Sequence, residues 1–167
     1  MTAQQFDPIQ YKAAQRQNWD AAARGWERRA DRIDESSREI SRALMELAHI
    51  QSGHRVLDIA SGTGEPALTI ARRVGPTGRV VATDQSSRML AVARSRAAAQ
   101  SLQNLEFREV DAEALDFPED SFDAAICRFG LMFLPDLAGS LQRIRPACYT
   151  PAVGSRRLSE TCRPKSL

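Results

Sequence analysis

Two glycines and an aspartate within residues 55–67 have the spacing of a ligand-binding turn. A short apolar strand pattern runs into a turn with Gly62 and Gly64, and a helix pattern follows. Glycines in such a turn let backbone N–H groups approach a ligand, because no Cβ stands in the way. Asp58 lies four residues before Gly62 and is expected to end the strand with a fixed negative charge. Such a charge disfavours a phosphate and favours a cation.

A second aspartate follows the next strand pattern. Residues 79–83 form this pattern, and Asp84 stands at its end, twenty residues after Gly64. A carboxylate in this position accepts hydrogen bonds from the vicinal hydroxyls of a ribose. The two glycines and Ala67 also fit the dinucleotide pattern G-x-G-x-x-G/A, so the turn by itself leaves an NAD-dependent oxidoreductase open.

Helices between the strands would bring these side chains together. Residues 65–74 and 86–100 have amphipathic helix patterns, and further strands are predicted at residues 105–110 and 121–127. Strands that alternate with such helices form right-handed βαβ units and a parallel sheet. The sequence therefore predicts an α/β fold, a Rossmann-like doubly wound parallel sheet of about four strands.

The ends of the predicted strands supply a set of small or acidic residues. Ligands of doubly wound sheets bind outside the carboxyl ends of the strands, where the strand order reverses. A single aspartate there is equally well explained as a helix N-cap. Helix capping alone does not explain why the residues at all of these strand ends fall on the same edge of the sheet. These residues are Asp58, Asp84, Asp111 and Cys127-Arg128.

The first fifty residues have the pattern of two helices. One stripe consists of Tyr11, Gln15, Trp19, Ala22 and Trp26, at steps of three or four residues. Two interpretations of the tryptophans stay open. Both rings pack in the core against the sheet, or one of them faces a cationic ligand, which is worth about 0.5–1 kcal/mol at an exposed site.

Four motifs in succession resemble those of a known family. They are VLDIASGTG at residues 56–64, ATDQSSRML at 82–90, DAEALDFP at 111–118, and SFDAA at 121–125 followed by FLPD at 133–136. In order and spacing they resemble the motifs of class I S-adenosylmethionine-dependent methyltransferases, and most closely the branch of the ubiquinone and menaquinone biosynthesis enzymes. The resemblance covers residues 11–145 and implies S-adenosylmethionine as the cofactor.

The resemblance also implies a role for each residue of the cofactor site. The turn would wrap the methionine moiety, Asp58 would order it on the ammonium side, and Asp84 would accept from both ribose hydroxyls. Gln85 and Met89 would border the adenine, and Asp111 and Ala112 would contact its edge. The implied set is Asp58, Ala60, Gly62, Thr63, Gly64, Asp84, Gln85, Met89, Asp111, Ala112 and Cys127. At Ala60-Ser61 the sequence departs from the family, in which a Gly-Cys pair is frequent.

Methyl transfer to a small organic acceptor requires alignment more than a dedicated base, because the sulfonium already activates the methyl group. His49 and His54 precede the first strand, at the edge opposite the ligand, so no catalytic residue is predicted. Residues after the fourth strand either line the acceptor pocket or have core or surface roles. These are Arg128, Phe129, Leu131 and Phe133.

Composition narrows the remaining function classes. The N-terminus has no apolar signal segment and no stretch is long enough for a membrane span, which predicts a cytoplasmic protein. Cys127, Cys148 and Cys162 lack metal-site spacing and are expected to be free thiols, with no metal bound. Four basic residues and one acidic residue follow residue 145. They are interpreted as a solvated tail and not as a nucleic-acid site.

The sequence divides into three predicted parts. Residues 1–50 are a helical lid, residues 51–145 are a partial S-adenosylmethionine-binding domain, and residues 146–167 are a disordered basic tail. In the resembled family a fifth strand, a helix and two more strands follow. Their absence after residue 145 suggests a truncation or frameshift, impaired turnover, and self-association through the exposed fourth strand. The alternatives are an NAD-dependent oxidoreductase fragment, which Asp58 and Asp111-Ala112 disfavour, and a non-catalytic cofactor-binding protein.

Overall fold

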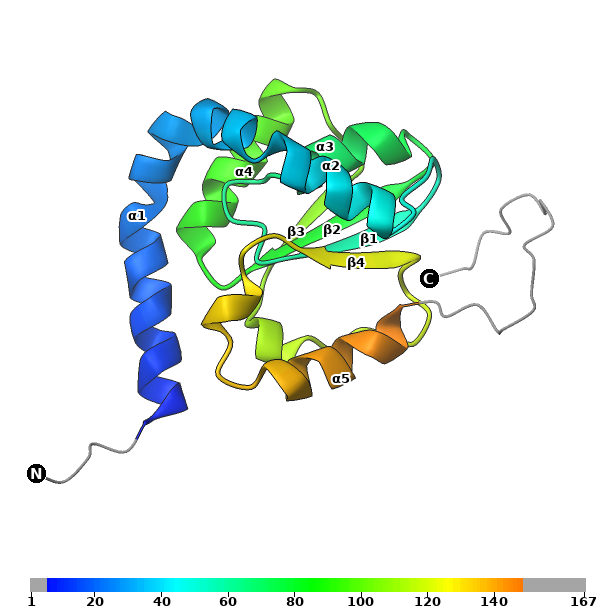
Figure 1. Ribbon diagram of the computed structural model, residues 1–167. Coiled ribbons are helices and arrows are strands. Elements are labelled where there is room, and N and C mark those ends of the chain that lie inside the picture. The colour runs from blue at the N-terminus through cyan, green and yellow to red at the C-terminus, as the bar shows by residue number, and fades with distance from the viewer. Residues whose placement is uncertain (1–5, 149–167) are drawn as a thin grey trace, which may run out of the picture.

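A computed structural model describes residues 6–148 of the 167-residue chain (Figure 1). In chain order its elements are α1 (Pro8–Ser36), α2 (Arg38–Leu47), β1 (Arg55–Ile59), α3 (Ala67–Val74), β2 (Arg79–Asp84), α4 (Ser87–Ala99), β3 (Leu105–Glu109), the 3-10 helix η1 (Ala112–Ala114), β4 (Ala124–Cys127), the 3-10 helix η2 (Leu131–Phe133) and α5 (Leu137–Ala147).

The four strands form one parallel sheet in the order β3-β2-β1-β4. β1 and β2 are buried along almost their whole length, as expected for strands that helices cover on both faces. The chain adds β2 and β3 on one side of β1 and then returns to place β4 on the other side. The strand order therefore reverses between β1 and β4, and a ligand site is expected at the carboxyl ends of these strands.

Each face of the sheet has its own apolar core. Val56 and Val80 pack with Met45 of α2 and Ile70 of α3 on one face. The neighbouring strand positions point to the other face, because side chains alternate along a strand. There Leu57 packs with residues of α5, including Ile144. Figure 1 shows α2, α3 and α4 on one side of the sheet and α5 on the other.

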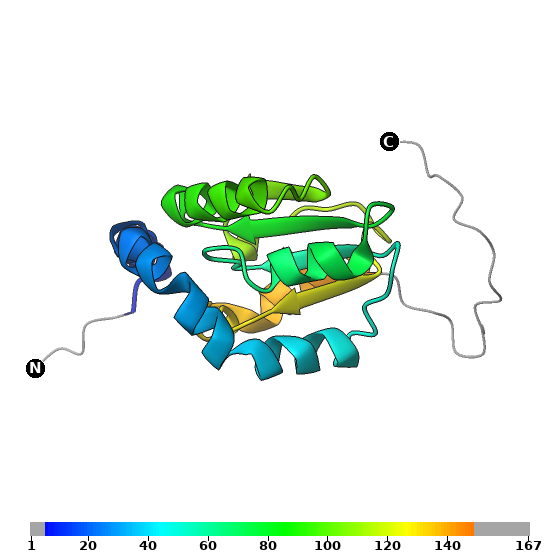
Figure 2. The ribbon, with the colours of Figure 1, turned by 90° about the horizontal axis from the view of Figure 1, so that it is seen from above.

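α1 is a long helix that starts at a well-formed cap. Asp7 accepts hydrogen bonds from the backbone N–H groups of Ile9 and Gln10, and Pro8 occupies the first helical position. Figure 2 shows α1 lying across the carboxyl ends of the strands. The two predicted N-terminal helices are therefore present, and the first of them covers the edge at which the ligand site was expected.

The predicted fold class is confirmed, and the differences lie at element boundaries. β4 begins at Ala124 and not at residue 121, and β3 ends one residue before the predicted boundary. The prediction of disorder from residue 146 is wrong for its first residues, because α5 continues through Pro146 to Ala147 and Cys148 forms a bridge with Phe122. Pro146 has no N–H to donate to the carbonyl four residues earlier, and the helix ends one residue after it. The rest of the predicted tail lies outside the described residues.

None of the helices within residues 6–148 combines the length and the apolar content needed to cross a membrane.

Candidate functional site

A cavity lies where α1 covers the carboxyl ends of β1, β2 and β4. Its walls come from five segments that are distant in the sequence, namely α1, the β1–α3 turn, the end of β2 with the start of α4, the β3–η1 connection, and the segment after β4. The lining residues are Lys12, Gln15, Trp19, Trp26, Ala60, Ser61, Gly62, Thr63, Glu65, Asp84, Gln85, Met89, Val110, Asp111, Ala112, Arg128, Phe129, Gly130, Phe133 and Leu134.

The β1–α3 turn gives the cavity its floor. Ala60 and Gly62 both have a φ of +55°, and a Cβ added to Gly62 would meet nothing within 4 Å. A Cβ added to Gly130 would stand 2.4 Å from the Cβ of Ala60, so glycine is required where the segment after β4 crosses the turn. Gly64 has a different role. A Cβ added to it would meet the side chain of Leu68, so glycine at this position allows close packing inside the protein and does not face the cavity.

The carboxylate of Asp84 is held in place by two backbone donors. The N–H of Gly62 donates to Oδ2 at 2.8 Å, and the N–H of Ser86 donates to Oδ1 at 2.9 Å. Burial raises the pKa of this carboxyl above its ordinary value, and these two hydrogen bonds act in the opposite direction. The result is an oriented acceptor group in the cavity wall, tied directly to the glycine turn.

Asp58 does not have the role that the sequence suggested. Its side chain is fully buried and does not line the cavity. Its Oδ2 accepts a hydrogen bond from the N–H of Ala67 at 3.1 Å, and its Oδ1 has no hydrogen-bond partner among the described residues. Burial raises its pKa to about 8, against the opposing effect of the Arg128 charge. The prediction of a fixed negative charge facing the ligand is therefore wrong, because the acid is mostly neutral at pH 7 and orders the start of α3.

Arg128 ties the cavity to the junction of α1 and α2. One of its terminal nitrogens donates to the hydroxyls of Ser37 at 3.0 Å and Ser41 at 3.1 Å, and the other donates to the backbone oxygen of Glu65 at 2.9 Å. The three acceptors are neutral, so the guanidinium places a fixed positive charge beside the buried Asp58. Burial also raises the pKa of the Glu65 carboxyl.

Aromatic rings form the wall opposite the turn. Trp19 contacts Trp26 edge-on, with ring centroids 5.9 Å apart, and it contacts Phe133 in the same way at 5.3 Å. Both tryptophans line the cavity, and neither belongs to the two core clusters found in the described part of the chain. Of the two interpretations of the sequence, packing in the core against the sheet is the wrong one.

Most of the residues proposed for the cofactor line this cavity together. These are Ala60, Gly62, Thr63, Asp84, Gln85, Met89, Asp111 and Ala112. Asp58, Gly64 and Cys127 do not line it, and burial raises the pKa of the Cys127 thiol to about 11. Of the acceptor candidates, Arg128, Phe129 and Phe133 line the cavity and Leu131 does not.

The sequence reasoning missed several lining residues, of which Lys12 is the most informative. Lys12, Gln15, Trp19 and Trp26 lie at steps of three, four and seven residues, so all four share one face of α1. The helical stripe already included the last three. Lys12 lies three residues before Gln15, next to the Tyr11 that the stripe used, so the i, i+3 spacing could have found it.

Comparisons with known proteins agree with this geometry. A family model described as a methyltransferase domain matches residues 56–148, more than half of the chain. A ubiquinone/menaquinone biosynthesis C-methyltransferase of Pseudomonas putida is 47% identical over 91 residues, which cover 54% of this chain and 36% of that protein. The chain thus spans about a third of the length of this relative.

Two solved structures are similar in fold. A SAM dependent methyltransferase from Aquifex aeolicus matches with a TM-score of 0.62 at 20% identity, covering 86% of this chain and 68% of that chain. An S-adenosylmethionine dependent methyltransferase from Mesorhizobium loti matches with a TM-score of 0.56 at 27% identity, covering 64% of this chain and 46% of that chain.

Proposed function

Because the chain belongs to the S-adenosylmethionine-dependent methyltransferase family, we propose that its cavity binds S-adenosylmethionine and serves methyl transfer to a small organic acceptor. The observation that carries the proposal is the link between Asp84 and Gly62. It places an oriented carboxylate and a glycine turn in one wall of the cavity, at the switch point of the sheet. The family match does not support the NAD-dependent oxidoreductase alternative.

The residues present fit this cofactor. The hydroxyl of Ser61 is buried in the cavity wall and has no hydrogen-bond partner among the described residues, so it is available to an amino-acid moiety. The space that a Cβ at Gly62 would enter is open. Asp84 offers carboxylate oxygens that accept from ribose hydroxyls. The cavity therefore provides polar contacts for the methionine and ribose parts of the ligand.

The adenine end is assigned by the same reasoning. Gln85 and Met89 would border the base, and the Asp111 carboxylate would accept from its exocyclic amine beside Ala112. Asp111 already accepts a hydrogen bond from the N–H of Glu113 at 2.9 Å, which fixes the orientation of its carboxylate. These roles are the ones that the family resemblance implies, and the presence of all four residues in the cavity wall supports them.

When bound, S-adenosylmethionine supplies a methyl group that its sulfonium activates for transfer. The work left to the chain is to align the acceptor with the methyl and to exclude water. The rings of Trp19, Trp26 and Phe133 close the cavity on the side of α1. An indole face next to the sulfonium would contribute about 0.5–1 kcal/mol, or more in a desolvated site. No general base is proposed.

Photochemical labelling tests the assignment. Ultraviolet irradiation of the full chain with methyl-labelled S-adenosylmethionine is expected to label peptides from the cavity wall. Excess S-adenosylhomocysteine should suppress the labelling and excess NAD should not. Labelling that NAD suppresses equally, or labelling confined to peptides outside the cavity, would contradict the proposed function.

The proposed domain organisation follows from the same cavity. Of the predicted lid at residues 1–50, α1 lies over the cavity, α2 packs on one face of the sheet through Met45, and residues 1–5 lie outside the described residues. Residues 51–145 act as the cofactor-binding part, and the proposed basic tail lies beyond the described residues apart from its first three. The methyl acceptor is the proposed partner, and neither nucleic acid nor a resident metal is invoked. A cytoplasmic location stays a prediction from the sequence.

Self-association through β4 is the remaining partner proposal. Within residues 6–148, β4 pairs only with β1. Just before β4, two bonds lie on its outer side, from the N–H groups of Asp120 and Phe122 to the backbone oxygens of Pro146 and Ala147. An edge strand of this kind recruits other chains. Light scattering over a concentration series should show a mass that rises with concentration. A mass equal to one chain at every concentration would refute the proposal.

A further inference from the structure

α1 is attached to the rest of the molecule by many polar contacts and by few fully buried apolar side chains. Only Ala23 and Ala30 are buried among its 29 residues. Neither apolar core cluster of the described chain contains a residue of α1. α1 therefore docks outside the two apolar cores, through the ring contact of Trp19 with Phe133 and through polar groups.

The N-terminal half of α1 is held by charged groups on the rim of the cavity. The ammonium of Lys12 lies 2.7 Å from Asp111 Oδ2 and 2.9 Å from Glu113 Oε2. One turn further along, Arg16 forms an ion pair with Glu109. Positions four residues apart share a helix face, so these pairs form one row along the rim.

The row continues with Asp20. Its carboxylate accepts from the Ser86 hydroxyl at 2.5 Å, and Ser86 is also the N-cap of α4, accepting from the N–H of Met89 at 3.1 Å. Met89 lines the cavity, and Ser86 donates its N–H to Asp84. The polar row on α1 is thus connected to the proposed ribose and adenine contacts.

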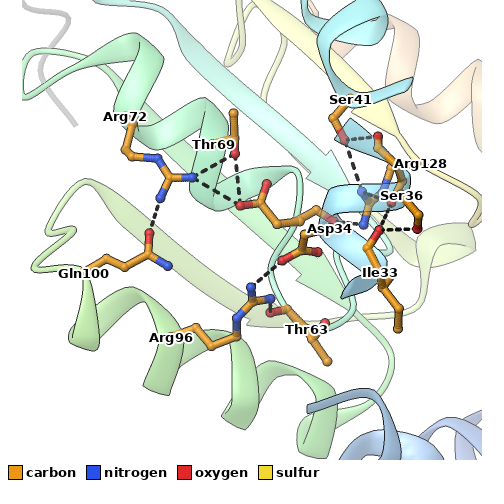
Figure 3. A network of polar contacts seen from close by, with 12 residues as sticks. Ile33, Asp34, Ser36, Ser41, Thr63, Thr69, Arg72, Arg96, Gln100 and Arg128 are labelled. Carbon is orange, nitrogen blue, oxygen red and sulfur yellow. Dashed lines mark hydrogen bonds and ion pairs between the residues drawn. The ribbon is translucent and has the colours of Figure 1, made fainter. Parts of the chain in front are cut away.

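The other end of α1 is anchored differently. Ser37, where α1 ends, is buried and accepts a hydrogen bond from Arg128. Arg96 bridges Asp34 and the backbone oxygen of Thr63, as Figure 3 shows. These two arginines fix the end of α1 to the glycine turn, so a movement of the helix would be a rotation about Ser37.

We propose that Lys12 is a positioning residue, whose ammonium latches α1 onto Asp111 and Glu113 and so sets how tightly the cavity closes. Asp111 is the carboxylate assigned above to the adenine amine, so closure of α1 and occupancy of the cavity meet at one side chain. The coupling to the ligand rests on the proposed function, whereas the latch itself is measurable without any ligand.

The two tryptophans provide the measurement. The sequence contains only Trp19 and Trp26, and both lie on the cavity face of α1, so all tryptophan fluorescence reports on the lid. Ion pairs at a partly exposed rim weaken as the screening length falls from about 10 Å at 0.1 M salt to about 3 Å at 1 M. Acrylamide quenching of the full parent chain is expected to increase between these two salt concentrations. A free tryptophan derivative corrects for the direct effect of salt.

Two matched variants separate the latch from general surface charge. Lys12→Met removes the latch, and Arg42→Met removes ion pairs to Glu39 and Glu46 on α2, away from the cavity. A partly exposed ion pair is expected to shift the equilibrium between the open and closed positions of α1 by about 1.5- to 5-fold. At low salt, Lys12→Met should raise acrylamide quenching of the tryptophans and weaken S-adenosylhomocysteine binding, each by up to this factor. Lys12→Arg should restore both to the values of the parent. Arg42→Met should match the parent in both measurements.

Salt-independent quenching of the parent, or equal quenching of the Lys12→Met and Arg42→Met variants, would overturn the latch. If Lys12→Met fails to fold by circular dichroism, the salt series on the parent decides. A parent chain with salt-dependent quenching that does not bind S-adenosylhomocysteine would refute the proposed function and leave the latch standing.

Discussion

Asp58→Asn is expected to change the pH dependence of stability more than any other single carboxyl substitution. The carboxyl is fully buried, and its pKa is raised by burial to about 8 from an ordinary value of 3.8. Asparagine has the shape of the neutral acid, and its carbonyl oxygen replaces the acceptor of the hydrogen bond from Ala67. The variant therefore preserves the contact and removes the titration.

The sign follows from proton binding. Between about pH 4 and pH 8 the folded parent keeps a proton on Asp58 that the unfolded chain releases, so its free energy of unfolding falls by up to about 1.4 kcal/mol per pH unit. This contribution is fully present below pH 3.8 and is lost as the pH rises towards 8. The stability of Asp58→Asn relative to the parent should therefore increase by about 2–3 kcal/mol from about pH 5 to pH 7.

Urea unfolding of both chains at several pH values measures this difference. Asp116→Asn, which removes one carboxylate at an exposed position, is the matched control. A stability difference between Asp58→Asn and the parent that stays constant from about pH 5 to pH 7 would show that the acid ionises normally in the folded chain. The electrostatic description of the site would then have to be revised.

Three further substitutions test the turn and its carboxylate. Gly62→Val should abolish binding of S-adenosylhomocysteine in calorimetry, because its side chain would enter the open cavity space and because valine is strained at the positive φ of residue 62, and circular dichroism should show that the chain remains folded. Asp84→Ala should weaken the same binding by about 1.5–3 kcal/mol, and an unchanged affinity would remove the ribose assignment. Ala60→Gly should raise the free energy of unfolding by about 1 kcal/mol, because residue 60 has a positive φ; a lower value in urea unfolding would contradict the strain argument.

The elements of the sheet could be predicted because their patterns are local. β1 and β2 are mostly apolar, with Asp58 one residue before the end of β1 and Asp84 at the end of β2, and each is followed by a helix with buried apolar residues. The placement of Asp84 in the cavity wall followed from the strand ends alone. The start of β4 was predicted less accurately. Residue 122 pairs with Cys148 at the end of α5 and not with β1, and this pairing depends on where α5 packs.

The errors concern contacts between distant parts of the chain. Asp58 was assigned a fixed charge because the sequence does not show that the folded chain buries it, with Ala67 of α3 as a hydrogen-bond donor and the Arg128 charge nearby, seventy residues later. Lys12 was missed because its partners, Asp111 and Glu113, follow it by about one hundred residues. A sequence pattern identifies which residues end a strand or share a helix face, but it does not show which charges from other elements will meet them.

Isothermal titration of the parent chain with S-adenosylhomocysteine and with NAD tests the central claim most directly. We expect S-adenosylhomocysteine to bind one site per chain, NAD to give no binding heat, and Gly62→Val to lose the response while its circular dichroism stays that of a folded chain. Binding of NAD in place of S-adenosylhomocysteine, or no binding of either ligand to a folded parent, would contradict the assignment of the cavity to S-adenosylmethionine.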